Sequence, residues 1–177
     1  MICTHCGGPL TSTRVSRPYA EVGLSNVTLM NVEVRLCRHC RGREVVLPCV
    51  EQLHDRIAHA IVLQPVALTP AAIRFLRTWL GLSCQDLAAL IGVSRETAFR
   101  WERQDKWYPM RCSADRLLRM LVASRKAVTV DPVDFLRVPP ESEARPIALC
   151  APTWELVGYG PALGGAAPAG RKNRART

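Results

Sequence analysis

Cys3-Thr4-His5-Cys6 is followed about thirty residues later by a second pair with the same spacing, Cys37-Arg38-His39-Cys40. A Cys-x-x-Cys pair can direct two thiolates at one point, so the two pairs together complete a tetrahedral shell of four sulfurs. Structural zinc prefers that shell. We therefore predict one zinc ion per chain, bound by Cys3, Cys6, Cys37 and Cys40. Two disulfides or four free thiols are the alternative interpretation of this spacing.

A glycine follows each pair, Gly7 directly and Gly42 one residue later. Glycine tolerates positive φ, so both positions are expected to let the backbone turn tightly under the sulfurs. His54 and His59, further along the chain, could each supply an extra ligand, but four thiolates already fill the shell. We therefore expect the metal to be held by cysteines alone.

Strand signals around this site are few. In residues 30–36 apolar side chains alternate with polar ones from Met30 to Leu36, the pattern of a half-buried strand that leads into the second pair. Residues 18–22 and 44–47 are weaker strand candidates. So few apolar residues cannot stabilise a small domain alone, and the metal is expected to contribute much of its stability.

Helical spacing of apolar residues predicts a helix from Pro48 to about residue 63. Residues 1–63 then form a metal-binding domain with a following helix, and residues 64–69 are interpreted as a short linker. For the helices of residues 70–130, three residues can cap N-termini: Thr69 just before the segment, and Ser83 and Ser94 within it. Two glycines can end helices: Gly81 and Gly92. A further helix, residues 114–124, is expected to turn four side chains inward: Leu117, Leu118, Met120 and Leu121.

Beyond Asp131 the apolar periodicity disappears, and Pro-, Gly- and Ala-rich stretches precede a basic tail. This composition predicts a largely disordered extension over residues 131–177. The expected fold class is therefore α+β. It comprises a β-rich zinc domain, an all-α domain over residues 70–130 and the extension.

The 177 residues can form one or two domains. No apolar run reaches the length of a membrane span, and the first residues do not resemble a secretion signal. Four metal-bound thiols and four unpaired ones favour a reducing cytoplasm. The unpaired cysteines are expected to be buried free thiols: Cys49, Cys84, Cys112 and Cys150.

The formal charge is +9, and residues 67–130 alone carry +6. Such a concentration of positive charge favours a polyanionic partner, nucleic acid first. A solvated basic surface is the alternative.

Leu87-Ala88, Ile91-Gly92-Val93-Ser94 and Thr97-x-x-Arg100-Trp101-Glu102 follow one another in this basic segment. Two short helices that meet at a glycine turn form a helix-turn-helix, and the arrangement resembles that of the Xre/Cro family of repressors. The resemblance implies that the helix starting at residue 95 lies in the DNA major groove. An ordinary helical hairpin with a charged face is the alternative. The base-contacting residues that the resemblance implies are Arg95, Glu96, Thr97 and Arg100.

The resemblance also implies contacts with the DNA backbone, and the matching positions here are Ser83, Gln85, Lys106 and Arg111. Cys84 departs from the family, which often has glutamine on a phosphate at that position. A structural ion pair between Arg77 and Glu102 is implied as well.

The combination of the two cysteine pairs with this helix-turn-helix resembles the MqsA-type antitoxins, also called the YgiT zinc finger/helix-turn-helix family. The resemblance covers about residues 1–125 and implies a homodimer that represses its own operon at a palindromic operator. It also implies that the zinc domain can mask a ribonuclease toxin. Two departures are the second knuckle, Cys-Arg-His-Cys-Arg-Gly, and the extension after residue 131.

Two other functions fit parts of the sequence. One is a stand-alone zinc-containing regulator with no toxin partner, and the other is an electron-transfer protein with iron in a rubredoxin-like site. Catalysis is not expected, because a closed tetrathiolate shell leaves no open position for water and no catalytic constellation stands out.

Overall fold

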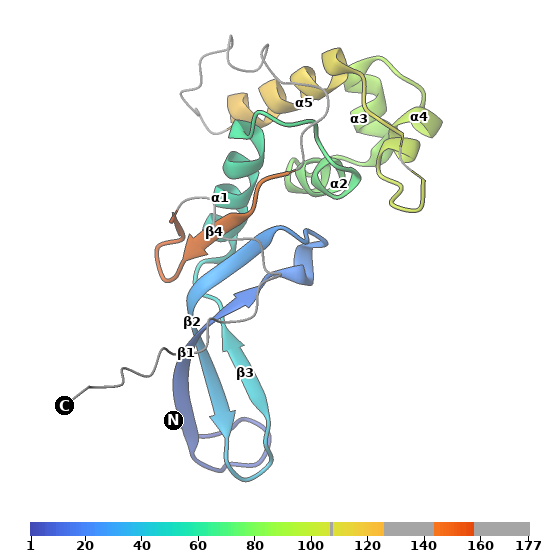
Figure 1. Cartoon of the computed structure of the whole chain (residues 1–177). Coiled ribbons are helices and arrows are strands. Elements are labelled where there is room, and N and C mark those ends of the chain that lie inside the picture. The colour runs from blue at the N-terminus through green and yellow to red at the C-terminus, as the bar shows by residue number, and fades with distance from the viewer. Residues whose placement is uncertain (107, 126–143, 158–177) are drawn as a thin grey trace, which may run out of the picture.

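The computed structural model describes residues 1–106, 108–125 and 144–157. Within these ranges the fold is α+β, with a five-stranded mixed sheet and the helices α1 to α5 (Figure 1). The element bounds in chain order are β1 Leu10–Pro18, 3-10 helix η1 Ala20–Val22, β2 Val27–Cys37, β3 Arg43–Val46, α1 Val50–Leu63, α2 Pro70–Trp79, α3 Cys84–Ile91, α4 Arg95–Trp101, α5 Cys112–Arg125, β4 Ile147–Cys150 and β5 Glu155–Leu156.

The central strand of the sheet is β2. Antiparallel β1 pairs along one side of β2, while β3 and the parallel strand β4 pair with different halves of its other side. The strand predicted at residues 30–36 is confirmed as part of β2, and the candidate at 44–47 corresponds to β3. The candidate at 18–22 is wrong, because Pro18 ends β1 and a 3-10 turn follows.

A β-bulge at Asn31 changes which β2 side chains face the core. Val15 pairs with Val32 but Arg17 pairs with Leu29, so β2 carries one extra residue, and Asn31 has a φ of 57°. Leu29 and Val32 are therefore both buried although they are three residues apart. The alternation predicted from Met30 to Leu36 holds in its middle, where Val32 and Val34 are buried, but Met30 is only half-buried and Leu36 at the strand end is exposed.

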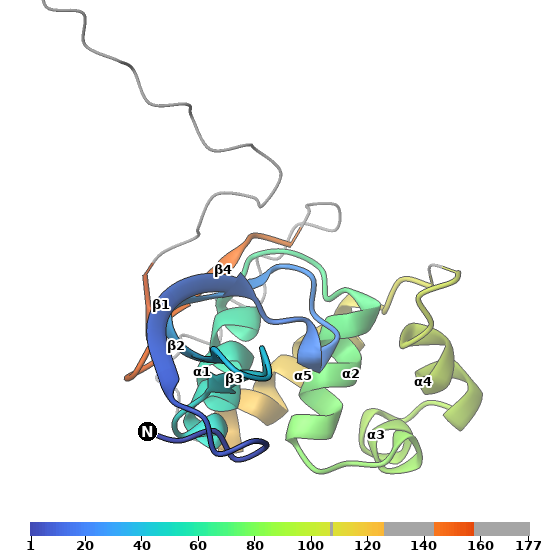
Figure 2. The ribbon, with the colours of Figure 1, turned by 90° about the horizontal axis from the view of Figure 1, so that it is seen from below.

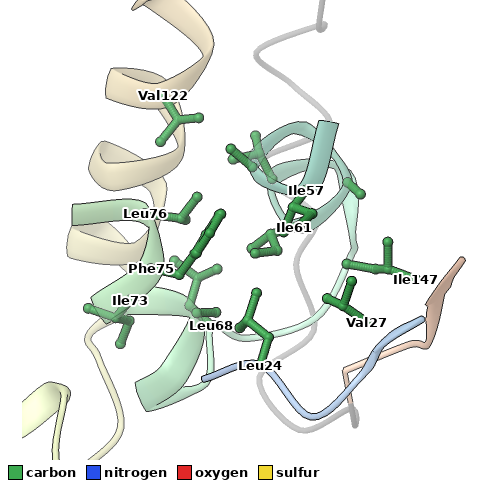
Figure 3. Packing of buried hydrophobic residues seen from close by; sticks show 14 of the residues in the cluster. Leu24, Val27, Ile57, Ile61, Leu68, Ile73, Phe75, Leu76, Val122 and Ile147 are labelled. Carbon is green, nitrogen blue, oxygen red and sulfur yellow. The ribbon is translucent and has the colours of Figure 1, made fainter. Parts of the chain in front are cut away.

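One hydrophobic core joins the sheet to the helices. Figure 3 shows Ile57 and Ile61 of α1 between two groups of side chains, with Val27 and Ile147 on the sheet side and Leu76 on the helical side. All five are buried. Helix α1 thus packs both on strands β2 and β4 and on the helices predicted as a separate domain.

Residues 64–69, predicted as a short linker, are held by two side chains of α5, Asp115 and Arg119. The guanidinium of Arg119, fully buried on α5, donates to the carbonyl oxygens of Val62 at 2.7 Å, Gln64 at 2.8 Å and Val66 at 2.5 Å. Its Nε donates to Asp115 at 2.5 Å, and the second Asp115 oxygen accepts from the Leu68 amide at 3.0 Å. A buried guanidinium needs this full set of acceptors, so the segment is packed as part of the core.

Residues 144–157, part of the extension predicted to be largely disordered, are ordered and contribute the strands β4 and β5 to the sheet. Ile147, Ala148 and Leu149 of β4 are buried, a short continuous apolar run of the kind that forms a fully buried strand. The Trp154 side chain is also buried, and its Nε1 donates to the Pro48 carbonyl oxygen at 2.8 Å. The prediction for 131–143 and 158–177 lies outside the described residues.

The helix starts follow the predicted caps. The hydroxyls of Thr69, Ser83 and Ser94 accept from backbone amides three residues on, and Ser83 forms a full capping box with Asp86. On α5, Leu118 and Val122 are buried, as Figure 3 shows for Val122.

Two sets of burial predictions are wrong. Leu117 and Met120 are 44% and 50% exposed, because the inward face of α5 follows Leu118 and Val122. Cys49 and Cys112 are exposed and Cys84 and Cys150 half-buried, since the first two stand at helix starts rather than in the core.

Candidate functional site

The four cysteines of the two pairs lie together at the end of the β-ribbon away from α2 to α5 (Figure 1). Their Sγ atoms all lie within 4.8 Å of one another, with 3.4 Å between Cys6 and Cys37 and 3.7 Å between Cys3 and Cys40. A tetrahedron with metal–sulfur bonds of about 2.3 Å has sulfurs about 3.8 Å apart, so the cluster fits one metal ion.

Both cysteine loops use the same backbone turn. The amide of Cys3 donates to the Gly8 carbonyl oxygen at 2.8 Å, and that of Cys37 donates to the Gly42 carbonyl oxygen at 2.9 Å. The residue before each of these glycines has positive φ, 70° at Gly7 and 57° at Arg41. Positive φ was expected at Gly42, and the structure places it at Arg41 instead.

Gly8 and Gly42 each lie close to a side chain of the cysteine loops. A Cβ on Gly8 would lie 3.1 Å from the His39 side chain, and one on Gly42 would lie 3.2 Å from Cys40 Sγ. Both contacts are tight, so a larger residue at either position would require the neighbouring side chain to shift by a few tenths of an ångström. The second knuckle departs from Cys-x-x-Cys-Gly because Arg41 stands where the first knuckle has Gly7. The two turns otherwise match, so Arg41 adopts the positive φ that is strained for a non-glycine residue.

Arg41→Gly is expected to stabilise the ribbon by about 0.5–1 kcal/mol. A left-handed conformation costs a non-glycine residue about 1–2 kcal/mol, and the greater freedom of glycine in the unfolded chain offsets part of the gain. Denaturant unfolding of the metal-loaded protein measures the change. Arg38→Gly is the matched control, since Arg38 is exposed in the same loop without positive φ and should not be stabilised. A loss of stability in both variants would contradict the assignment of strain.

The sulfurs also perturb one another. The amides of Cys40 and His39 lower the pKa of the Cys37 thiol to about 6. The Gly42 amide acts likewise on Cys40, but the sulfur of Cys6 and partial burial outweigh it and raise the pKa of Cys40 to about 12. A cation among the sulfurs would relieve this competition. Among the described residues the cluster contains no histidine, and His54, one of the two considered as an extra ligand, has its Nε2 3.1 Å from the Tyr19 hydroxyl.

A second candidate site is the outer face of α4. Helix α4 packs on α3 across the turn at Gly92, whose φ is 78°, on the side of the molecule away from β1 (Figure 2). The Arg77 guanidinium donates to both carboxylate oxygens of Glu102 at 2.5 and 2.9 Å, which confirms the predicted ion pair. Ala98 and Trp101 are buried, so α4 is fixed on one side and open on the other.

The predicted base-contacting residues lie on or beside the open face. Arg95, Glu96 and Arg100 are exposed, and Thr97 is half-buried with its hydroxyl 3.0 Å from that of Ser94. The backbone amide of Glu96 itself and the Ser94 hydroxyl lower the pKa of the Glu96 carboxyl. Its carboxylate therefore faces the N-terminus of α4, where a negative charge is stabilised.

The predicted backbone-contacting residues are exposed, but their surroundings differ. Ser83 is engaged in its capping box, whose Asp86 carboxylate also accepts from the Ser83 amide at 2.9 Å. Lys106 Nζ lies 5.3 Å from the centre of the Tyr108 ring, and Arg100 lies 6.0 Å from the same ring. Lys106 and Arg100 thus lie next to the same aromatic ring, that of Tyr108, a residue that sequence reasoning missed. Gln85 and Arg111 are exposed.

Phe99 is another residue that sequence reasoning missed, and it is 60% exposed on α4. Its place four residues after Arg95 was the available signal, since residues at that spacing share a helix face.

In the described ranges no helix is both long and apolar enough to cross a membrane. Comparison with protein-family models, curated proteins and solved structures gave no match to the chain.

Proposed function

We propose that the chain is a sequence-specific DNA-binding repressor of the antitoxin type, built on one structural zinc ion. The observation that carries the proposal is the cationic outer face of α4, held rigidly by α3 and by the Arg77–Glu102 pair. A helix fixed in this way can enter the major groove with its N-terminal residues toward the bases. The +6 charge of residues 67–130 supports a polyanionic partner.

In this proposal the zinc ion stabilises the fold and takes no part in catalysis. Four thiolates form a closed shell, which leaves no position for water or substrate. The sulfur distances suit zinc, and they suit iron in a rubredoxin-like electron-transfer site as well. Colour separates the two metals, since a ferric tetrathiolate is red and zinc is colourless.

The DNA-contacting residues of the proposal follow from their placement on α4 and beyond it. Arg95 and Arg100 contact base edges, where an arginine can bind guanine through two hydrogen bonds. Lys106 and Arg111 contact phosphates. Glu96 is better explained by a favourable charge at the N-terminus of α4 than as a base reader, because the backbone amide of Glu96 and the Ser94 hydroxyl lower the pKa of its carboxyl.

The proposed active form is a homodimer on a palindromic operator, because one helix-turn-helix covers too few bases for a long site. Leu117 and Met120 are exposed one turn apart on α5 and are the proposed dimer contact. A cytoplasmic toxin bound by the zinc ribbon completes the antitoxin function. A stand-alone regulator without a toxin shares all these features, and the neighbouring gene distinguishes the two if it encodes a small basic ribonuclease.

The experiment that tests DNA binding compares two substitutions on a duplex selected from a random pool by the wild-type protein. Arg100→Ala should weaken binding to the selected duplex by about 1–3 kcal/mol and relax base preference. Lys106→Ala should weaken binding to all duplexes alike and lower the salt slope by about one. Titrations on selected and scrambled duplexes at several salt concentrations measure both effects.

Two outcomes would count against this assignment. If Arg100→Ala lowers both affinities equally, Arg100 contacts phosphates. If the wild-type protein enriches no sequence from the pool, the repressor proposal itself is wrong.

A further inference from the structure

Phe99 is a large apolar side chain in a cationic setting. It is 60% exposed on the outer face of α4, one turn after Arg95. It is not among the residues that pack on the hydrophobic core in the described part of the chain. An exposed aromatic ring there keeps a large apolar area in water, which a binding partner could cover.

The surface beside Phe99 suits a polyanion. An open groove of about 570 Å³ is lined by Phe99 together with four arginines, Arg74, Arg77, Arg95 and Arg103. Arg77 is paired with Glu102, and Arg103 is paired with Asp105. Arg74 and Arg95 are exposed. A partner that covers Phe99 must therefore offer an apolar group next to negative charge.

The DNA major groove offers one such group. The C5-methyl of thymine is the apolar feature that bases display there, and phenylalanine is among the side chains that contact it. We propose that Phe99 is a specificity-determining residue that contacts the methyl group of a thymine, with Arg95 beside it on the same face. This inference rests on the proposed DNA-binding function and adds an apolar element to its arginine readout.

The test removes the methyl group alone. In the duplex selected by the wild-type protein, each thymine is replaced in turn by uracil, which pairs identically but lacks the C5-methyl. Wild-type affinity should fall about fourfold at one thymine of each half-site, the effect expected for burying one methyl group. Phe99→Ala should bind the thymine and uracil duplexes equally, whereas Phe99→Leu should retain part of the discrimination.

Leu63→Ala is the matched control, because Leu63 is a 50% exposed apolar residue at the end of α1. It should discriminate like the wild type. Thermal melting of each variant confirms that it is folded. Wild-type indifference to uracil at every position would overturn the proposal, as would a Phe99→Ala effect equal on selected and scrambled duplexes. The latter result would mean that Phe99 contributes to DNA binding without reading a base. A wild-type protein that selects no duplex is a separate failure, of DNA binding itself.

Discussion

Replacing Arg119 by alanine is expected to lower the free energy of unfolding by about 3–5 kcal/mol, the usual cost of breaking a buried ion pair. The substitution would leave the Asp115 carboxylate buried without its cation, and the carbonyl oxygens of Val62, Gln64 and Val66 without their donor. Denaturant unfolding followed by circular dichroism gives the value. The cooperativity of unfolding should also fall, because α5 would lose its hydrogen bonds to the end of α1.

Two further variants sharpen this test. Arg119→Lys should recover little of the loss, since an ammonium group cannot reproduce the planar fork that reaches several acceptors at once. Arg56→Ala on α1 is the matched control, an exposed arginine whose loss should change stability by no more than about 0.5 kcal/mol. An Arg119→Ala protein as stable as the Arg56→Ala control would refute the structural role of the buried guanidinium.

Metal removal has the second large expected effect, confined to the end of the ribbon. Structural zinc contributes about 10–16 kcal/mol of binding free energy to folding in small zinc peptides. Cys37→Ser or a strong chelator should therefore disorder the two cysteine loops and the adjacent ends of β1, β2 and β3. The other end of β2 should persist, because Val27 and Leu29 lie in the core shared with α1. Hydrogen exchange resolves the two halves of the ribbon.

Cys49→Ser is the control for the metal experiment, since Cys49 is an exposed cysteine outside the four-sulfur cluster. Native mass spectrometry should find one zinc per chain in the wild type and in Cys49→Ser, and none in Cys37→Ser. Full protection of the cysteine loops after complete metal removal would contradict a structural ion. So would a protein purified with no bound metal.

Local signals in the sequence predicted the local parts of the structure. Helix caps and cysteine spacing each involve residues only a few positions apart, so the sequence alone was enough to predict them. Examples are the caps at Thr69, Ser83 and Ser94 and the two Cys-x-x-Cys pairs. Strand β1 was missed because its residues are mostly Ser, Thr and Arg, with little alternation to mark it. The bulge at Asn31 was missed because one inserted residue inverts the burial pattern without changing composition.

Features that depend on distant contacts were the least predictable. Arg119 has the sequence signature of a surface residue on an amphipathic helix, and its burial depends on carbonyl groups more than fifty residues earlier. The strand β4 consists of four residues in a segment without periodicity, and it needs β2 as a partner to form. On α4, the open face was predictable from the repressor-like pattern, but the exposure of Phe99 and the position of Tyr108 were not.

The parallel pairing of β4 with β2 sets the order in which the chain can fold during synthesis. Asn31 of β2 donates to the carbonyl oxygen of Ala151, 120 residues later. While the ribosome is still making the helices, β2 therefore lacks one neighbour over the half that β4 will cover, and Trp154 has not yet been made. Long-range strand pairing of this kind is slow and leaves apolar edges exposed meanwhile. The nascent chain must protect that edge until residue 157 has left the exit tunnel.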